Sequence, residues 1–218
     1  MKDIKAAIFD LDGTLIDSMY VWEKVDIDFL TERGIPVTKE YTDIVRSMFF
    51  ETAAAYTKET YHLSESVEEI MQVWLDMAHS EYANRVKAKP YASEYLKQLK
   101  SNGVILGIAT SNNPYLLKPC LENNGMNGIF SCICYTSEVG LNKSCPDIYL
   151  YTAEKLGVKP EECVVFEDII EGLKSASSVG MKTVAVYDSS NDDYMDEIKV
   201  TADRFITSYK EMLDEIFE

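Results

Sequence analysis

The sequence predicts an α/β protein with a doubly wound, Rossmann-like parallel sheet and an inserted all-helical domain. From residue 90 onward, short apolar runs alternate with helical patterns, which is typical of a parallel sheet with helices on both faces. Near the N-terminus, the run Ile4–Phe9 is broken only by Lys5 and has the composition of a buried parallel strand. Between Ser18 and Tyr82 no strand pattern occurs, so this block is expected to be helical.

The helical block is expected to contain four helices. Apolar residues recur at near-helical spacing from Met19 until Gly34, which is a suitable C-terminal stop. The other three helices are predicted over Lys39–Met48, Glu51–Tyr61 and Val67–Arg85. We therefore expect a helical cap domain over residues 18–87 and an α/β core made of residues 1–17 and 88–218, with linkers near Asp17–Met19 and Arg85–Lys89.

The remaining chain is expected to alternate regularly between helix and strand. The predicted helices are Ala92–Lys100, Tyr115–Asn123, Asp147–Leu156, Glu171–Ser178, Asp192–Lys199 and a last one from Tyr209. The predicted strands are Val104–Ala109, Cys132–Tyr135, Cys163–Phe166, Thr183–Val186 and Arg204–Ile206. The acidic tail Glu211–Glu218 is expected to be a solvated helix face.

Composition narrows the possible partners and compartment. The 218 residues are 46% hydrophobic, which suffices for a packed core, and carry a formal charge of −16. This charge disfavours binding to nucleic acid and to anionic membranes, and no apolar run approaches the roughly 18 residues of a membrane span. The N-terminus does not have the pattern of a signal peptide. Five cysteines without paired spacing indicate reduced thiols, so a cytoplasmic location is expected.

The chemistry is expected to begin where the first strand ends. Asp10 and Asp12 follow the apolar run one residue apart, and Gly13-Thr14 comes directly after them. Ligands of open α/β sheets bind at the carboxyl ends of the strands. Two carboxylates placed there would repel each other unless a cation lies between them, and hard divalent cations such as Mg²⁺ prefer carboxylate and carbonyl oxygens. A plain turn would explain Gly13 but would not require both acids.

Three later segments bring polar groups to the ends of other predicted strands or to the start of a helix. The strand Val104–Ala109 leads into Thr110-Ser111-Asn112, whose hydroxyl and amide groups suit an anion or a helix cap. Lys143 precedes a helix opened by Pro146. The strand Cys163–Phe166 ends in Glu167-Asp168, where Asp168 could also act as a helix cap.

Together these segments resemble the four motifs of the haloacid dehalogenase (HAD) superfamily, whose members are mostly phosphatases. The first motif is carried by Asp10-Leu11-Asp12-Gly13-Thr14-Leu15 with Asp17-Ser18, the second by Thr110, the third by Lys143 with Pro146-Asp147, and the fourth by Glu167-Asp168. The motifs occur in order over the whole chain. The resemblance implies an α/β core with a helical cap inserted after the first motif.

The resemblance also implies a role for each motif residue. Asp10, Asp12 and Lys143 would be catalytic, with Asp10 as nucleophile and Asp12 as general acid and base. Thr110, Ser111, Asn112 and Lys143 would bind the substrate's phosphoryl group. Mg²⁺ would be held by Asp10, Asp12 and Asp168, with Glu167 supporting the site without binding the ion. The expected substrate is a small phosphorylated metabolite, such as a sugar phosphate.

Departures from the motifs leave other interpretations of the function open. Ser144 stands where the family often has proline, and Ile169 stands where it commonly has a serine that could orient the metal site. A β-phosphoglucomutase-like phosphoryl transfer is the nearest alternative within the family. A histidine and an arginine contribute to that reaction, whereas Trp22 and Phe49-Phe50 stand near their positions here, with Arg46 close by.

Two more distant interpretations are disfavoured by the sequence. A receiver-like module that only accepts a phosphoryl group would not need Asp12 or the helical cap. Dehalogenase activity is disfavoured because the metal-binding acids are retained.

Overall fold

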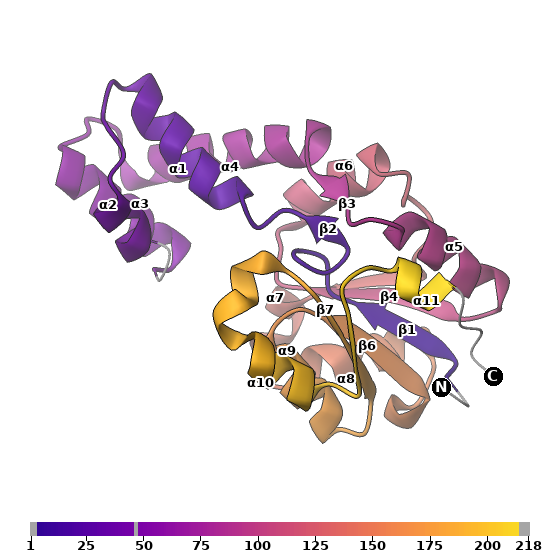
Figure 1. The fold of residues 1–218 in the computed structure, drawn as a ribbon. Helices are drawn as coiled ribbons and strands as arrows, with labels where there is room; N and C mark the ends of the chain where they lie inside the picture. Colours follow the sequence, from indigo (N-terminus) through magenta and orange to yellow (C-terminus); the bar gives the residue numbers. More distant parts are fainter. Residues whose placement is uncertain (1–3, 46–47, 214–218) are drawn as a thin grey trace. The chain divides into compact units, whose positions relative to one another are not determined.

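The computed structural model describes residues 4–45 and 48–213, and the chain forms two compact units. One unit consists of Met1–Ser18 together with Val86–Glu218, and the other of Met19–Arg85. The first unit contains the sheet and the second is helical (Figure 1).

The first unit is built on a six-stranded parallel sheet, which confirms the predicted fold class. The strands in spatial order are β5 (Cys132–Tyr135), β4 (Ile105–Thr110), β1 (Ala6–Phe9), β6 (Cys163–Glu167), β7 (Lys182–Val186) and β8 (Arg204–Ile206). Every neighbouring pair is parallel. From β1 the chain first builds one side of the sheet and then returns to build the other, so the direction of strand addition reverses beside β1. Such a switch point is where open α/β sheets bind ligands.

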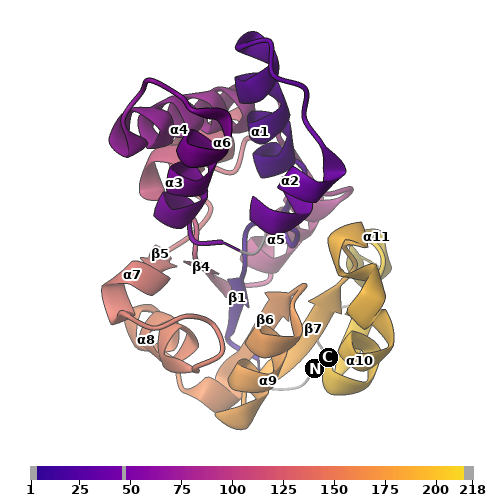
Figure 2. The ribbon, with the colours of Figure 1, turned by 90° about the vertical axis from the view of Figure 1, so that its left-hand side faces the viewer.

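Helices cover both faces of this sheet (Figures 1 and 2). The helices are α5 (Ala92–Ser101), α6 (Pro114–Asn123), α7 (Thr136–Val139), α8 (Asp147–Leu156), α9 (Ile170–Ser178), α10 (Met195–Thr201) and α11 (Lys210–Leu213). Two 3₁₀ helices, η1 (Pro160–Glu162) and η2 (Ser189–Tyr194), join them.

Alternating side chains of the central strands pack against different helices. Ile8 of β1 belongs to a buried cluster with Ile148 and Ala153 of α8. The next residue, Phe9, stacks on Phe166 of β6 at 4.4 Å between ring centroids. Since fully burying one such side chain contributes about 1.5–3 kcal/mol, these strands and the positions of their carboxyl ends are firmly fixed.

The second unit consists of four helices, α1 (Val21–Glu32), α2 (Lys39–Val45), α3 (Phe50–Tyr61) and α4 (Val67–Asn84). Helix α4 begins with a capping box, in which the Ser66 hydroxyl and the Glu69 carboxylate each accept a hydrogen bond from the other residue's backbone N–H. Trp74 of α4 packs edge-on against Phe29 of α1 at 5.7 Å. Phe50 of α3 also packs against Trp74, at 5.7 Å, so α1, α3 and α4 share an aromatic core.

Several short elements differ from the sequence-based expectation. A two-stranded antiparallel ribbon, β2 (Ile16–Asp17) and β3 (Lys87–Ala88), was not predicted, because two-residue strands carry no periodicity. The helix expected from Asp192 instead begins as η2 at Ser189 and continues as α10. Residues 46–47 of the second predicted helix and residues 214–218 of the acidic tail lie outside the described residues.

Candidate active site

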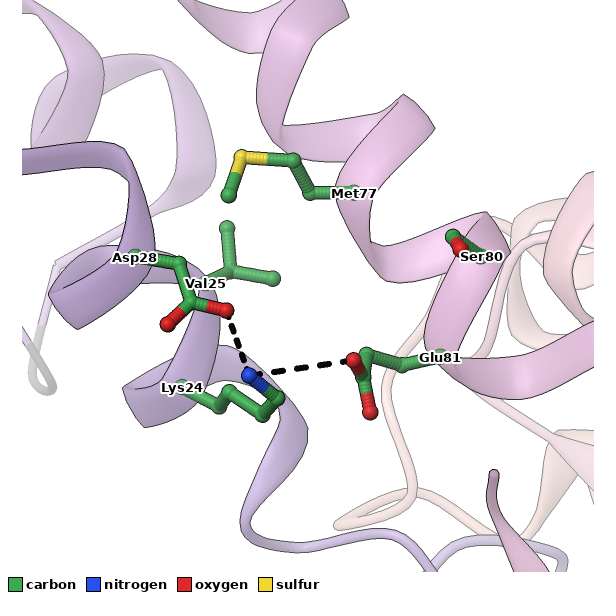
Figure 3. A pocket seen from close by; sticks show the side chains of 6 residues that line it. All are labelled: Lys24, Val25, Asp28, Met77, Ser80 and Glu81. Carbon is green, nitrogen blue, oxygen red and sulfur yellow. Dashed lines mark hydrogen bonds and ion pairs between the residues drawn. The ribbon is translucent and has the colours of Figure 1, made fainter. Parts of the chain in front are cut away.

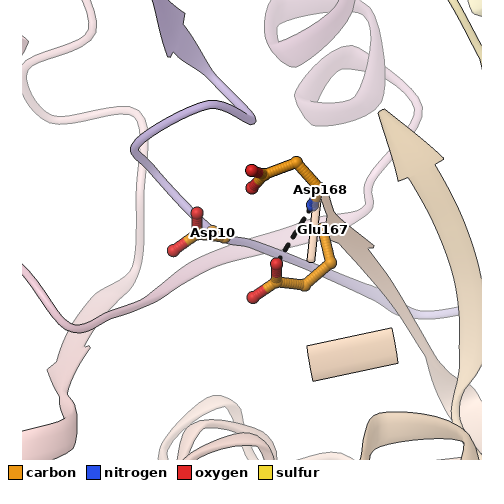
Figure 4. Close-up of side chains that lie close together, drawn as sticks. All are labelled: Asp10, Glu167 and Asp168. Carbon is orange, nitrogen blue, oxygen red and sulfur yellow. Dashed lines mark hydrogen bonds between the residues drawn. The ribbon is translucent and has the colours of Figure 1, made fainter. Parts of the chain in front are cut away.

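Two central strands bring three acidic residues to one edge of the sheet. Asp10 directly follows β1, while Glu167 ends β6 and Asp168 follows it. Carboxylate oxygens of these three buried residues all lie within 4.8 Å of one another, and Figure 4 shows their side chains gathered at the strand ends. The parallel register, with Phe9 opposite Phe166, places both acidic positions at the same level.

Lys143 supplies the cation of this cluster. Its ammonium group is buried and donates hydrogen bonds to Asp10 Oδ1 and Glu167 Oε1. Burial acts to lower the pKa of Lys143, but the two carboxylates outweigh it and hold the pKa above its ordinary value. The lysine therefore stays charged and bridges Asp10, the candidate nucleophile, and Glu167 of the fourth motif.

All of the hydrogen-bonding capacity of Glu167 is used within the protein. Besides Lys143, Oε1 accepts from the Tyr149 hydroxyl at 2.8 Å. Oε2 accepts from the backbone N–H groups of Asp168 at 3.0 Å and Ile169 at 3.3 Å. A carboxylate has about four lone-pair sites, so Glu167 would have to give up a bond to bind an ion. The backbone approaches closely here, since a Cβ on Gly172 would lie 2.6 Å from Glu167 Cδ.

Asp168 is held differently, with one hydrogen bond to each carboxylate oxygen. Oδ1 accepts from the Thr14 hydroxyl at 2.8 Å, and Oδ2 accepts from the Asn191 side-chain amide at 2.9 Å. Gly13, with φ +78°, lies so close that a Cβ there would be 2.6 Å from Asp168 Oδ2. Each oxygen keeps a lone pair for a further ligand. The glycine of the first motif thus makes room for the acid of the fourth.

The electrostatics of the cluster favour a bound cation. Burial raises the pKa of Asp10 well above its usual value, the Lys143 ammonium opposes this, and the neighbouring acids add to it. Burial and Glu167 raise the pKa of Asp168 to about 7, although the Thr14 hydrogen bond and Lys143 lower it. Three buried carboxylates with a single lysine are under-neutralised, and an all-oxygen donor set of this kind suits a hard divalent cation. The residues present therefore fit a metal ion.

Asp12 lies beside this cluster and is only half-buried. Its Oδ1 accepts from the Ser18 hydroxyl at 2.6 Å, and its Oδ2 accepts from the Asn112 side-chain amide at 2.7 Å. Asn112 was predicted to bind substrate, and in this structure its amide is engaged by Asp12. These two bonds fix the orientation of the Asp12 carboxylate and connect the first motif to the second.

The predicted anion-binding segment lies at the end of β4, next to β1. Thr110 is fully buried, and its hydroxyl accepts from the Asn112 backbone N–H at 3.0 Å. Ser111 is exposed. The following helix α6 is capped by Asn113, whose side chain accepts from the Tyr115 N–H. Thus Asn113, rather than Thr110 or Ser111, caps the helix, and the latter two remain available for a ligand.

Sequence reasoning gave no role to four residues that hold this site together. Thr14 and Ser18 lie within the quoted first motif but only their spacing was used. Tyr149 lies on α8, and no sequence pattern marks it as part of the site, because its apolar neighbours are typical of an ordinary core position. Asn191 lies 23 residues after Asp168, in a polar turn where no pattern distinguishes it.

The residues that lie near the positions which the resemblance links to mutase activity are in the helical unit. Trp22 packs edge-on against Phe50 at 5.3 Å, and Phe49 is highly exposed. Arg46 lies outside the described residues. Aromatic side chains therefore occupy the positions at which the resemblance would place a histidine and an arginine.

A cavity of about 150 Å³ also lies in the helical unit, between α1 and α4 (Figure 3). Lys24 lies in it between Asp28 and Glu81, whose Oε1 is 3.8 Å from the ammonium nitrogen. Arg85 makes a second ion pair with Glu81. The charges balance within this group, and the cavity contains none of the predicted site residues.

No helix in the described ranges, 4–45 and 48–213, is long and apolar enough to cross a membrane. All five cysteines are free. Both findings agree with the composition of the chain.

The fold and the site geometry together define a doubly wound α/β protein with an acidic cluster at the strand ends. The haloacid dehalogenase-like hydrolase family matches residues 4–180, so the chain belongs to this family, as the motifs predicted. The chain is thus a hydrolase by class, and curated relatives of it carry phosphatase names.

Two relatives and one solved structure illustrate the similarity. Hexitol phosphatase B of Escherichia coli (strain K12) is 25% identical over 194 residues, which cover 85% of this chain and 84% of the relative. "Phosphorylated carbohydrates phosphatase" of Thermotoga maritima is 26% identical over 190 residues, covering 87% and 88%. The solved structure, of a "putative beta-phosphoglucomutase from Thermotoga maritima", has a TM-score of 0.85 at 25% identity and covers 97% of both chains.

Proposed function

We propose that the protein is a magnesium-dependent phosphatase that hydrolyses a small phosphorylated metabolite, such as a sugar phosphate, through an aspartyl-phosphate intermediate. The observation that carries this proposal is the junction of Asp10, Lys143, Glu167 and Asp168 at one sheet edge. A carboxylate attacks a dianionic ester only if charge at the phosphorus is neutralised. This cluster offers one fixed cation and an oxygen-rich place for a second.

Each group has a distinct proposed task. Asp10 attacks the phosphorus with the oxygen that Lys143 does not hold, and the P–O bond to the leaving group breaks. Asp12 gives its proton to the departing alkoxide. In the second step Asp12 takes a proton from water, the water oxygen attacks the phosphorus, and the bond to Asp10 breaks. One group can serve both steps because the first leaves it ready to act as a base.

The remaining residues bind and orient. Thr110, the Ser111 backbone amide and Lys143 would hold the other phosphoryl oxygens. Mg²⁺ would be held by Asp10, the backbone carbonyl of Asp12 and Asp168, and would neutralise charge and align the phosphoryl group. Four protein donors already bind the Glu167 carboxylate, which supports the proposal that Glu167 does not coordinate the ion directly.

Steady-state release of inorganic phosphate tests this proposal. A panel of phosphate esters, including p-nitrophenyl phosphate and sugar phosphates, should be turned over with Mg²⁺ and not after EDTA treatment, with activity restored by added Mg²⁺. Asp10→Asn is the matched inactive control. A single stoichiometric burst without turnover would instead indicate a receiver-like phosphoryl acceptor, and activity indifferent to EDTA would remove the metal from the proposal.

Phosphoryl transfer between two positions of a sugar phosphate is the second candidate. The likeness to the structure named as a beta-phosphoglucomutase favours it, whereas Trp22 and Phe50 disfavour it. Incubation with β-glucose 1-phosphate separates the two: a phosphatase yields glucose and phosphate, and a mutase yields glucose 6-phosphate.

A further inference from the structure

The Asp168 carboxylate is held by side chains from two segments that are remote from it in sequence. Thr14 donates to Oδ1, and Asn191 of η2 donates to Oδ2. The residue next to Asp168, Ile169, has no side-chain donor, and its backbone N–H is directed to Glu167. Orientation of Asp168 by a side chain must therefore come from elsewhere in the chain.

We propose that Asn191 is a positioning residue that fixes the Asp168 carboxylate for binding a divalent cation. This inference rests on the proposed function, because it takes Asp168 as a metal ligand. Donors on both oxygens prevent the carboxylate from rotating about its Cβ–Cγ bond, and each oxygen keeps a lone pair. Groups that orient metal ligands in this way commonly control metal affinity.

The chemistry of the contact specifies an amide donor. The Asn191 nitrogen lies 2.9 Å from Asp168 Oδ2 and 3.2 Å from the Asp168 backbone oxygen. Both partners are acceptors, so only the NH₂ end of the side chain can face them. A neutral donor of this kind stabilises the ionised carboxylate in its buried surroundings without adding a charge that would repel a cation.

The turn that carries Asn191 is itself anchored. Asp188, directly before η2, is buried; its Oδ1 accepts from the Ser190 N–H at 2.9 Å and its Oδ2 from the Lys89 ammonium at 2.8 Å. Lys89 also donates to the Tyr187 backbone oxygen at 2.7 Å, and its own N–H donates to the Leu15 carbonyl at 2.8 Å. The amide is therefore held by a fixed framework, which a positioning group requires.

The test is the affinity for Mg²⁺ in the absence of substrate, measured by isothermal titration calorimetry on the full chain. Asn191→Ala should raise the Kd for Mg²⁺ by about tenfold, the lower end of the effect of removing a group that orients a metal ligand. Asn191→Leu keeps the volume and removes the amide, and should show the same loss. Ser190→Ala is the matched control, because its exposed side chain lies in the same turn and leaves the backbone bond to Asp188 intact.

Two further readouts separate positioning from folding. The melting temperature without Mg²⁺ should stay close to that of the wild type in Ser190→Ala, and in the two Asn191 variants it should fall by no more than the loss of one hydrogen bond to a charged group causes. The Mg²⁺ concentration for half-maximal activity should rise in parallel with Kd in the Asn191 variants alone. If both Asn191 variants bind Mg²⁺ within twofold of the wild type, the role of Asn191 is overturned while the proposed function stands. If the wild type binds no Mg²⁺ at millimolar concentration, both are overturned.

Discussion

The side-chain amide of Asn112 donates a hydrogen bond of 2.7 Å to Oδ2 of Asp12, across 100 residues of sequence. The other oxygen of Asp12 is held by Ser18. In the proposed mechanism Asp12 is the general acid and base, which must point at the atom it protonates, so this pair of donors would set its orientation for catalysis. We infer from this contact that Asn112, which was expected to bind the phosphoryl group, supports Asp12 instead.

Asn112→Ala should therefore lower kcat by about tenfold, a part of the roughly 10²–10⁴-fold that general acid–base catalysis contributes. KM for a good substrate should change by less than twofold. Steady-state kinetics with Mg²⁺ check this, with Asn113→Ser as the control, since serine can still cap α6. A rise in KM at unchanged kcat would instead show that Asn112 binds the substrate.

Asp10→Asn should abolish turnover, with a loss on the order of 10⁴-fold or more, as for other nucleophiles that cannot be replaced. The asparagine side chain cannot form the acyl phosphate, although it preserves the shape of the aspartate. Phosphate release and mass spectrometry of the protein after exposure to substrate check this. Residual activity within a hundredfold of the wild type would exclude the covalent route.

Tyr149→Phe should destabilise the α/β unit by about 1.5–3 kcal/mol, the usual contribution of a hydrogen bond to a charged group. Its hydroxyl donates to the fully buried Glu167, which would lose one of its four donors. Urea denaturation measures the change. The control is Tyr151→Phe, whose exposed hydroxyl makes a 3.4 Å contact with Glu138. It should change stability by less than about 0.5 kcal/mol, and equal losses in both variants would contradict the assignment.

Asp26→Asn should stabilise the helical unit at alkaline pH. Burial raises the pKa of Asp26 to about 6, opposed by the Tyr41 hydroxyl. A carboxyl with a raised pKa in the folded state favours folding below its unfolded pKa, and this contribution is lost as the pH rises through 6.

The variant should thus exceed the wild type by about 2 kcal/mol at pH 8, and this advantage should disappear near pH 4. Thermal unfolding followed at both pH values provides the measurement. Asp43→Asn, which alters an exposed ion pair with Lys39, should have little effect at either pH. An advantage for Asp26→Asn that is the same at pH 4 and pH 8 would show that titration is not its cause.

The sequence predicts the fold and the acidic centre of the site for the same physical reason. Buried parallel strands are apolar throughout, so Asp10 and Glu167-Asp168 mark where two strands leave the core. The order of the motifs then predicted that they meet, and their carboxylates do lie together. Lys143 could be found only through the resemblance, because a lysine in a loop is usually solvated.

The supporting residues could not be predicted in this way. Asn191 and Tyr149 contact the acids through tertiary structure, and their identities fit a turn and a helix core equally well. The donors to Asp12 required knowing that the loop after β4 lies beside the loop after β1. Short elements such as α7 escaped detection because four residues do not establish a helical period.

The β2–β3 ribbon has a consequence for how the chain could evolve or be engineered. Asp17 and Lys87 are paired across an antiparallel ladder, so the two crossings between the sheet unit and the helices are neighbours. Residues 19–85 could therefore be exchanged for another insert of any size, or replaced by a tight hairpin, without stretching the remaining chain. The helical unit can in this way vary as an exchangeable module while the acidic cluster at the strand ends stays unchanged.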